Sequence, residues 1–218
     1  IYLDGGVTPT LTTERMTVDE TMFRIGLGWK FGGNLPAAKV AAAPVSGFYA
    51  GAGLGHGSLN SQLDGIHTDG GTTSAFTGAF ADIGASAGLF AGYGWALNRW
   101  YLGLELEADA NGPNWEHVRT GNARDFSADK KGDIGLALRL GYTLQNGVLI
   151  YGRAGEVRGK FNTTWVKGGS SANWIDRDDK INGSRFGLGA EVPMGSGFMR
   201  LDYTFTEYDS YNFVTTHA

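Results

Sequence analysis

Large apolar side chains alternate with charged or very small ones between residues 21 and 31. The apolar positions are Phe23, Ile25, Leu27, Trp29 and Phe31, and the positions between them are Arg24, Gly26, Gly28 and Lys30. A β-strand sends successive side chains to opposite faces, so this stretch is predicted to be a strand with one apolar face. In a soluble β-sandwich that face would be core, whereas in an outer-membrane barrel it would contact lipid.

The same alternation recurs in seven later segments between residues 47 and 213. Tight turns are predicted at 98–99, at Asn146-Gly147 and at 195–197. Long polar connections are predicted at 57–80, 111–131 and 166–183, and 207–218 together with 1–20 would form a fourth. Long and short connections therefore alternate, as they do in bacterial outer-membrane barrels.

These elements predict one all-β domain, an eight-stranded antiparallel up-and-down transmembrane β-barrel in the outer membrane of a Gram-negative bacterium. Its expected parts are an extracellular loop at 1–20, a closing strand at 21–31, a periplasmic linker at 32–46 and the remaining seven strands at 47–213. The closing strand would thus come first in the chain.

Aromatic residues collect near the predicted turn ends, where they would form an interfacial girdle. They are Trp29, Phe31, Phe48, Trp95, Trp100, Tyr142 and Phe198. The alternative is a soluble sandwich or a lipocalin-like barrel, whose exterior is charged. The strand faces opposite the apolar stripes here hold glycine and charges of both signs, which favours the membrane barrel.

Composition removes several classes of function. The chain has 218 residues, no cysteine and a net charge of −4, so disulfides and thiolate metal sites are excluded and nucleic-acid binding is not expected. No run of 18 apolar residues is present, so no transmembrane helix is predicted. Neither a cofactor nor a metal site is expected.

If the apolar faces contact lipid, the opposite faces send charged side chains into the lumen. The cations are Arg24, Lys30, Arg139, Arg153, Arg185 and Arg200, and the anions are Glu105, Glu107, Asp109, Glu191 and Asp202. An eight-stranded barrel has a lumen that side chains can fill, and charges inside it must be paired. The sequence therefore predicts a salt-bridged plug and not a pore.

One strand, from Val148 onward, has an ambiguous phase. If Arg153 points inward, Glu156 and Arg158 point toward lipid unless a β-bulge near Gly155 changes the phase. Three explanations stay open: such a bulge, a position near the lipid headgroups, or a protein contact on the Glu156/Arg158 face.

Several motifs resemble those of small outer-membrane barrels of the outer-membrane protein A type, including alphaproteobacterial porin-family surface antigens. Ser46–Gly51 is similar to the family's opening strand, Phe23–Phe31 to its closing strand and Ile150–Arg153 to its fifth. The resemblance implies the barrel fold, but the closing strand comes first here. The chain is therefore either a circular permutant, or residues 1–31 close a preceding barrel of a tandem array.

The leading functional hypothesis is a non-enzymatic barrel that acts through its loops, because loops on a rigid scaffold commonly carry binding. Trp115, Trp165 and Trp174 are the candidate contacts, and the expected partners are outer-membrane lipid and lipopolysaccharide, a partner protein or a second copy. The alternatives are a lipid hydrolase that uses His56 and Ser58, or capture of a ligand such as haem through loop histidines such as His67 and His117.

Overall fold

The computed structural model describes residues 10–31, 46–69, 72–110, 114–117, 124–167 and 174–217, although some side chains at the strand ends lie outside this description. Its elements are strands and turns. The strands are β1 Thr10–Phe31, β2 Gly47–Asp69, β3 Thr72–Leu97, β4 Trp100–Ala110, β5 Asn114–His117, β6 Arg124–Thr143, β7 Leu149–Lys167, β8 Trp174–Met194 and β9 Gly197–His217. Within the described residues, no helix is long and apolar enough to cross a membrane.

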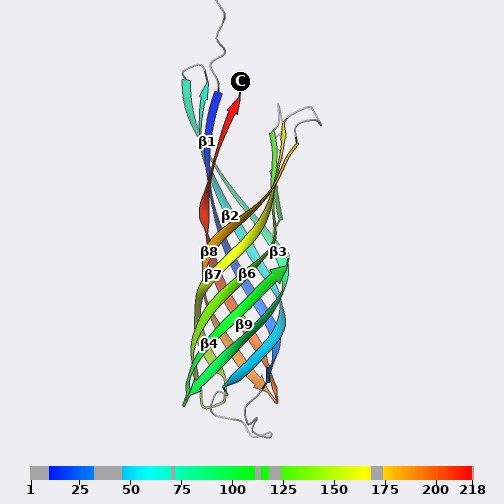
Figure 1. Cartoon of the computed structure of the whole chain (residues 1–218), viewed down its shortest axis with the longest axis vertical. Helices are drawn as coiled ribbons and strands as arrows, with labels where there is room; N and C mark the ends of the chain where they lie inside the picture. Colours follow the sequence, from blue (N-terminus) through cyan, green and yellow to red (C-terminus); the bar gives the residue numbers. More distant parts are fainter. Residues whose placement is uncertain are drawn as a thin grey trace, which may run out of the picture.

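Every strand pairs antiparallel with its neighbours, and the sheet closes on itself. The order runs from β4 through β3, β2, β1, β9, β8 and β7 to β6, and β4 then pairs with β6. The short strand β5 lies beyond the end of β4 along the same edge of β6. The sheet therefore forms a barrel of steeply tilted strands (Figure 1). Residues 21–31, predicted to be the closing strand, pair with both β2 and β9.

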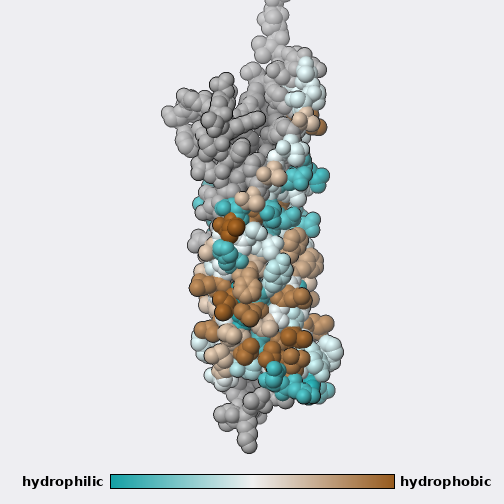
Figure 2. Space-filling view, turned by 180° about the vertical axis from the view of Figure 1, so that it is seen from behind, coloured by the Kyte–Doolittle hydropathy of each residue, from teal (hydrophilic) through white to brown (hydrophobic). Residues whose placement is uncertain are grey.

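The two faces of the barrel wall have opposite chemistry. In β4 the burial alternates without interruption: Leu102, Leu104 and Leu106 are exposed, whereas Tyr101 and Glu105 are buried. The outside of the barrel is therefore apolar and its inside polar, which is the arrangement expected when lipid is the outer solvent. Figure 2 shows the result as a brown band on the described surface with hydrophilic residues above and below it.

The strands are longer than predicted, because they extend into segments that were wrongly predicted to be loops. Much of 1–20, 57–80, 111–131, 166–183 and 207–218 is extended β-structure, although 1–9, 70–71, 111–113, 118–123, 168–173 and 218 lie outside the described residues. The physical reason is that strands can pair through their backbones beyond the lipid, where the outward positions no longer need to be apolar. Such segments show no apolar stripe, so hydrophobic alternation reports only the part of a strand that faces lipid.

Beyond the closed part of the barrel the sheet divides into two arms. The β8–β9 pairing extends no further than Gly183 opposite Tyr208, and the β3–β4 pairing no further than Ala87 opposite Ala110. We call the continuation of β9, β1, β2 and β3 the first arm, and that of β5, β6, β7 and β8 the second arm. Figure 1 shows the two groups of strands diverging at one end of the molecule.

The opposite end carries the tight turns, and we call it the turn end. Asn98, Gly147 and Gly195 have positive φ values of 57°, 85° and 66°, which Asn and Gly tolerate better than other residues. The three short turns predicted from the sequence are therefore present. β1 ends and β2 begins at this end, and residues 32–45 of the predicted linker lie outside the described part of the chain.

Six of the seven residues assigned to the aromatic girdle lie on the outer face of the barrel. Trp29, Phe31, Phe48, Trp95 and Trp100 are exposed, and the ring of Tyr142, which is half-buried, lies 5.3 Å from that of Trp100 in a T-shaped pair.

The exception is Phe198, which is only 2% exposed and points into the barrel, so its place in the girdle was wrongly predicted. It has the same strand phase as the inward-facing Arg200, and it packs over Gly28, where a Cβ atom would overlap its ring.

The ambiguity in β7 resolves in favour of an inward Arg153. The β6–β7 and β7–β8 registers run without a shift through Gly155, so the proposed bulge at that point was wrong. Glu156 and Arg158 are exposed on the outer face. A register shift lies instead in β6, between Lys130 and Gly132.

Candidate functional site: a charged barrel interior

Inward-facing side chains from six strands form one charged interior. All eleven side chains that the sequence assigned to the lumen lie on this face: nine are buried, and Arg24 and Lys30 are partly exposed. β1 supplies Arg24 and Lys30, β4 supplies Glu105, Glu107 and Asp109, and β6, β7, β8 and β9 supply the rest. Along each strand the charged residues alternate with apolar ones. Because successive side chains of a strand point to opposite faces and the apolar ones point outward, the charged ones point into the barrel.

Glu105 is the centre of the half of the interior that lies nearer the turn end. Its side chain has no exposure to solvent. Arg200 contacts it with both terminal nitrogens, at 2.7 and 2.8 Å, and Arg139 donates a hydrogen bond to it at 3.2 Å. Tyr49 Oη donates a further hydrogen bond at 3.0 Å. One carboxylate from β4 therefore joins side chains of β2, β6 and β9.

Two further carboxylates complete this half. Glu191 accepts a hydrogen bond from Arg139 and lies 3.7 Å from the Lys30 ammonium. Asp202 accepts hydrogen bonds from Arg200 and from the Tyr151 hydroxyl.

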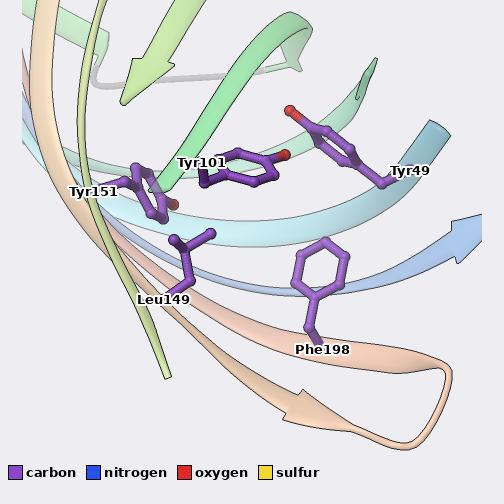
Figure 3. Close-up of a cluster of buried hydrophobic side chains, with 5 residues drawn as sticks. All are labelled: Tyr49, Tyr101, Leu149, Tyr151 and Phe198. Carbon is purple, nitrogen blue, oxygen red and sulfur yellow. The ribbon is translucent and has the colours of Figure 1, made fainter. Parts of the chain in front are cut away.

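A cluster of buried aromatic and aliphatic side chains lies between this half of the network and the turn end. It consists of Tyr49, Tyr101, Leu149, Tyr151 and Phe198, and Figure 3 shows these side chains gathered inside the barrel. The guanidinium of Arg139 lies 3.8 Å from the Tyr151 ring centroid, and that of Arg200 lies 4.4 Å from that of Phe90. Arginine stacks favourably on aromatic faces, so this cluster supports the cations as well as excluding water.

Arg185 is the centre of the half of the interior that lies nearer the arms. It contacts Glu107 at 2.8 Å, Asp109 at 3.4 Å and Asp133 at 2.8 Å. It also reaches Glu20 at 3.3 Å and donates a hydrogen bond to Thr206. Three strands, β1, β4 and β6, thus supply the carboxylates around a single guanidinium.

Lys130 and Arg153 link this half to its surroundings. Lys130 contacts Glu20 at 2.7 Å and Asp133 at 2.5 Å, and Arg153 reaches both Glu105 and Glu107. The two halves therefore form one connected network. Within the described part of the chain, its ion pairs join seven cations to seven carboxylates.

Sequence reasoning missed Glu20, Lys130, Asp133 and Tyr208. Glu20 and Lys130 fell within predicted loops, although Glu20 shares the inward phase of Met22 and Arg24. Asp133 shares the phase of Gly135 and Arg139, so extending the alternation would have found it. Lys130 could not be found in this way, because the register shift beside it changes the phase.

The interior is closely packed around the network. A void of about 30 Å³ lies beside Phe90, Arg153 and Asp202, which is room for very few water molecules. Toward the arms, Phe161 and Tyr208 form a T-shaped pair at 5.2 Å, with Val18, Leu59 and Ile181 also buried. Charges removed from water in this way are stable only with partners, and each one here has them.

The candidates for catalysis or ligand capture do not form a site. His56 is exposed on the outer face of β2 with Ser58 two residues away, and no hydrogen bond joins His56 to Ser58 or to a described carboxylate. The side chains of His67 and His117 lie outside the description, as do those of Trp115, Trp165 and Trp174. The described residues contain no group of three metal-ligating side chains.

A family model for the outer membrane protein beta-barrel domain matches residues 33–218. The chain belongs to this family. The outer-membrane barrel is accordingly an integral protein of the Gram-negative outer membrane, and the predicted location is confirmed. The matched range begins after β1, yet β1 pairs with both strands beside it.

Solved structures similar to this outer-membrane barrel include domains of two autotransporters. The transport unit of the autotransporter AIDA-I from Escherichia coli is 12% identical, covers 93% of this chain and 89% of its own, and has a TM-score of 0.32. The beta domain of the Bordetella autotransporter BrkA is 14% identical, covers 94% and 98%, and has a TM-score of 0.24. No curated protein matches the chain.

Proposed function

We propose that this outer-membrane barrel is a non-enzymatic structural and interaction protein with a closed lumen, which meets its partners through the two arms. The observation that carries the proposal is the continuous network of ion pairs across the interior. A barrel whose cross-section is filled by paired charges and aromatic rings has no room for a solute path. The two arms, which extend beyond the lipid, are then the part of the protein available for contacts with partners.

We further infer that the transmembrane part is an eight-stranded barrel with a circularly permuted strand order. The support for eight strands is that β5 continues along β6 where β4 ends, so that both occupy one place in the sheet. The support for permutation is that β1, with the closing-strand motif Phe23–Phe31, pairs with the first and last of the other strands.

The arms are the proposed contact region. They lie at the end opposite the short turns, and in bacterial outer-membrane barrels short turns are periplasmic. Both arms present exposed strand edges beyond Ala87 and Gly183, where β3 and β8 no longer pair with β4 and β9. Such edges can take up a further strand from a partner protein or a second copy, and lipopolysaccharide lies at the same level.

Ion conductance tests the closed lumen. We expect the full chain, reconstituted into planar bilayers, to give no steady channel at physiological salt. Replacing Arg139 and Arg185 together by alanine removes one buried cation from each half of the network, and any conductance should appear only in that variant. A steady nanosiemens conductance from the unmodified protein would refute the closed lumen.

Site-specific photo-cross-linking on intact cells tests the arms. A photoreactive residue at exposed Thr73 or Ala75 in the first arm should yield adducts with neighbouring protein or lipopolysaccharide. The matched control is the exposed Gln145 in a turn at the opposite end. If the arm positions gave no more adduct than Gln145, while the barrel was correctly folded, the arms would not be the contact region.

A further inference from the structure

One edge of the first arm has no strand beside it. β3 pairs with β2 from Thr72 onward, but it pairs with β4 only from Ala87 onward. In the part of the chain that the structure describes, no strand pairs with the other side of β3 between Thr72 and Ser86, and β5 pairs with β6. The backbone N–H and C=O groups on that side of β3 can therefore bond to a further strand.

The composition of this edge does not prevent such pairing. Residues 72–81 form a run of ten residues without a charge or a proline, and Asp82 ends the run. Exposed edges of natural sheets are commonly protected by charged side chains or proline. The edge strand β8 of the second arm follows this rule, because residues 176–180 are all charged. On β9 the uncharged part of the free edge is shorter, from 210 to 216.

The side chains of the β3 edge are small or β-branched. Thr73, Ala75, Thr77 and Ala79 alternate along the strand, so they share one face, and all four are exposed. Threonine favours strands, and like charges placed directly opposite each other would destabilise a strand pair. A second strand of the same composition would meet neither charge repulsion nor bulky side chains on this face.

The direction of β3 determines how two copies could meet. β3 runs from the far end of the first arm toward the turn end, where Leu97 precedes the turn at Asn98. Figure 1 shows both arms at the end of the molecule opposite the short turns. All copies in one outer membrane have the same orientation, so their β3 strands run in the same direction. Copies in two facing membranes have opposite orientations, and their β3 strands are antiparallel.

Antiparallel pairing is the arrangement that two identical edges can share. In an isologous contact the same surface of each copy meets the other across a two-fold axis. Opposing residues of an antiparallel pair can exchange equivalent hydrogen bonds, whereas opposing residues of a parallel pair make different ones. Two β3 edges therefore match each other between facing membranes and not within one membrane.

We propose that residues 72–81 of β3 join two copies of this chain across facing outer membranes by antiparallel strand pairing. The second copy is the occupant because the same uncharged segment supplies both sides of the pair, so that no like charges oppose each other. The first arms of the two copies then form one continuous sheet between the membranes. This inference rests on the proposed contact role of the arms, and it does not depend on the closed lumen.

Tethering of vesicles tests the proposal. The full chain is reconstituted with its arms outward into two populations of phosphatidylcholine vesicles that carry dyes of different colours, and tethering is the fraction of vesicles of one colour that coincide with the other. We expect the unmodified protein to tether the two populations. Ala75→Lys/Ala79→Lys should reduce tethering by about tenfold or more, because it gathers four positive charges in one short strand pair.

The matched control is Gln62→Lys/Ile66→Lys. These exposed residues lie directly opposite Ala79 and Ala75 on β2, which is paired on both sides. The added charges are the same, but β2 lies about 10 Å from the strand of the second copy, beyond the screening length of about 8 Å at physiological salt. The control should therefore change tethering by less than about twofold.

Two results would overturn the proposal: tethering that persists in the folded Ala75→Lys/Ala79→Lys variant, or absence of tethering by the folded unmodified protein. Folding is checked for each variant by the shift on a denaturing gel with heating. In the second case, adducts from Thr73 or Ala75 with a different protein or with lipopolysaccharide would still support the arms as the contact region, so the two proposals fail separately.

Discussion

Replacing Glu105 by alanine is expected to lower the free energy of unfolding by about 3–5 kcal/mol, the cost of breaking a buried ion pair by removing one partner. Glu105 has no solvent exposure, and the Arg139 and Arg200 guanidiniums contact it within 3.2 Å. Truncation leaves both cations buried with less negative charge around them, and water cannot enter so packed a region to solvate them. The measurement is urea-induced unfolding from lipid vesicles, followed by tryptophan fluorescence.

The control for this prediction is Glu207→Ala. Glu207 is an exposed carboxylate on β9, and its loss should change the free energy of unfolding by less than about 0.5 kcal/mol. A double variant, Glu105→Ala/Arg200→Met, removes a charge of each sign and should lose less stability than the sum of the two single changes. Additive losses, or a change of under about 1 kcal/mol for Glu105→Ala alone, would show that the interior does not depend on this carboxylate.

Deleting β1 is expected to abolish the folded barrel. β1 is paired with β2 along Leu11–Phe31 and with β9 along Thr10–Trp29. Without it, both neighbours present unpaired N–H and C=O groups inside the lipid, where each costs several kcal/mol. A chain that begins at residue 32 should therefore run at the same position on a denaturing gel with and without heating, whereas the full chain should shift on heating.

Moving β1 to the other end of the chain provides the rescue. A chain in which residues 46–218 precede residues 1–31 restores every strand pair of the native sheet and should recover the heat-dependent shift. If the relocated chain recovers the shift, the permuted order is supported. The native and relocated chains have the same strand pairs and differ in the position of the chain termini and in the omitted residues 32–45. Failure of the relocated chain, or folding of the chain that lacks β1, would contradict the inference that β1 is the closing strand.

The phase of each strand could be predicted from the sequence because it depends on local chemistry. Lipid on one side of every strand requires an apolar residue at every second position, so the inward positions are those between. This reasoning placed Glu105, Arg139 and Arg200 inside correctly. It did not reach past the apolar stripe: Glu20, in a predicted loop, is buried on β1, because this strand continues by backbone pairing beyond Phe23, where its outward positions become polar.

The ion-pair partner of each interior charge was decided by the tertiary structure alone. Glu105 contacts arginines that follow it by 34 and 95 residues, because barrel closure and register bring β6 and β9 to the same height as β4. A single register shift turns Lys130 inward and leaves Lys131 outward, so one lysine joins the interior network and its neighbour is exposed on the outer face. Alternation along one strand determines the face on which a side chain lies, whereas its partners depend on the relative heights of strands far apart in the chain.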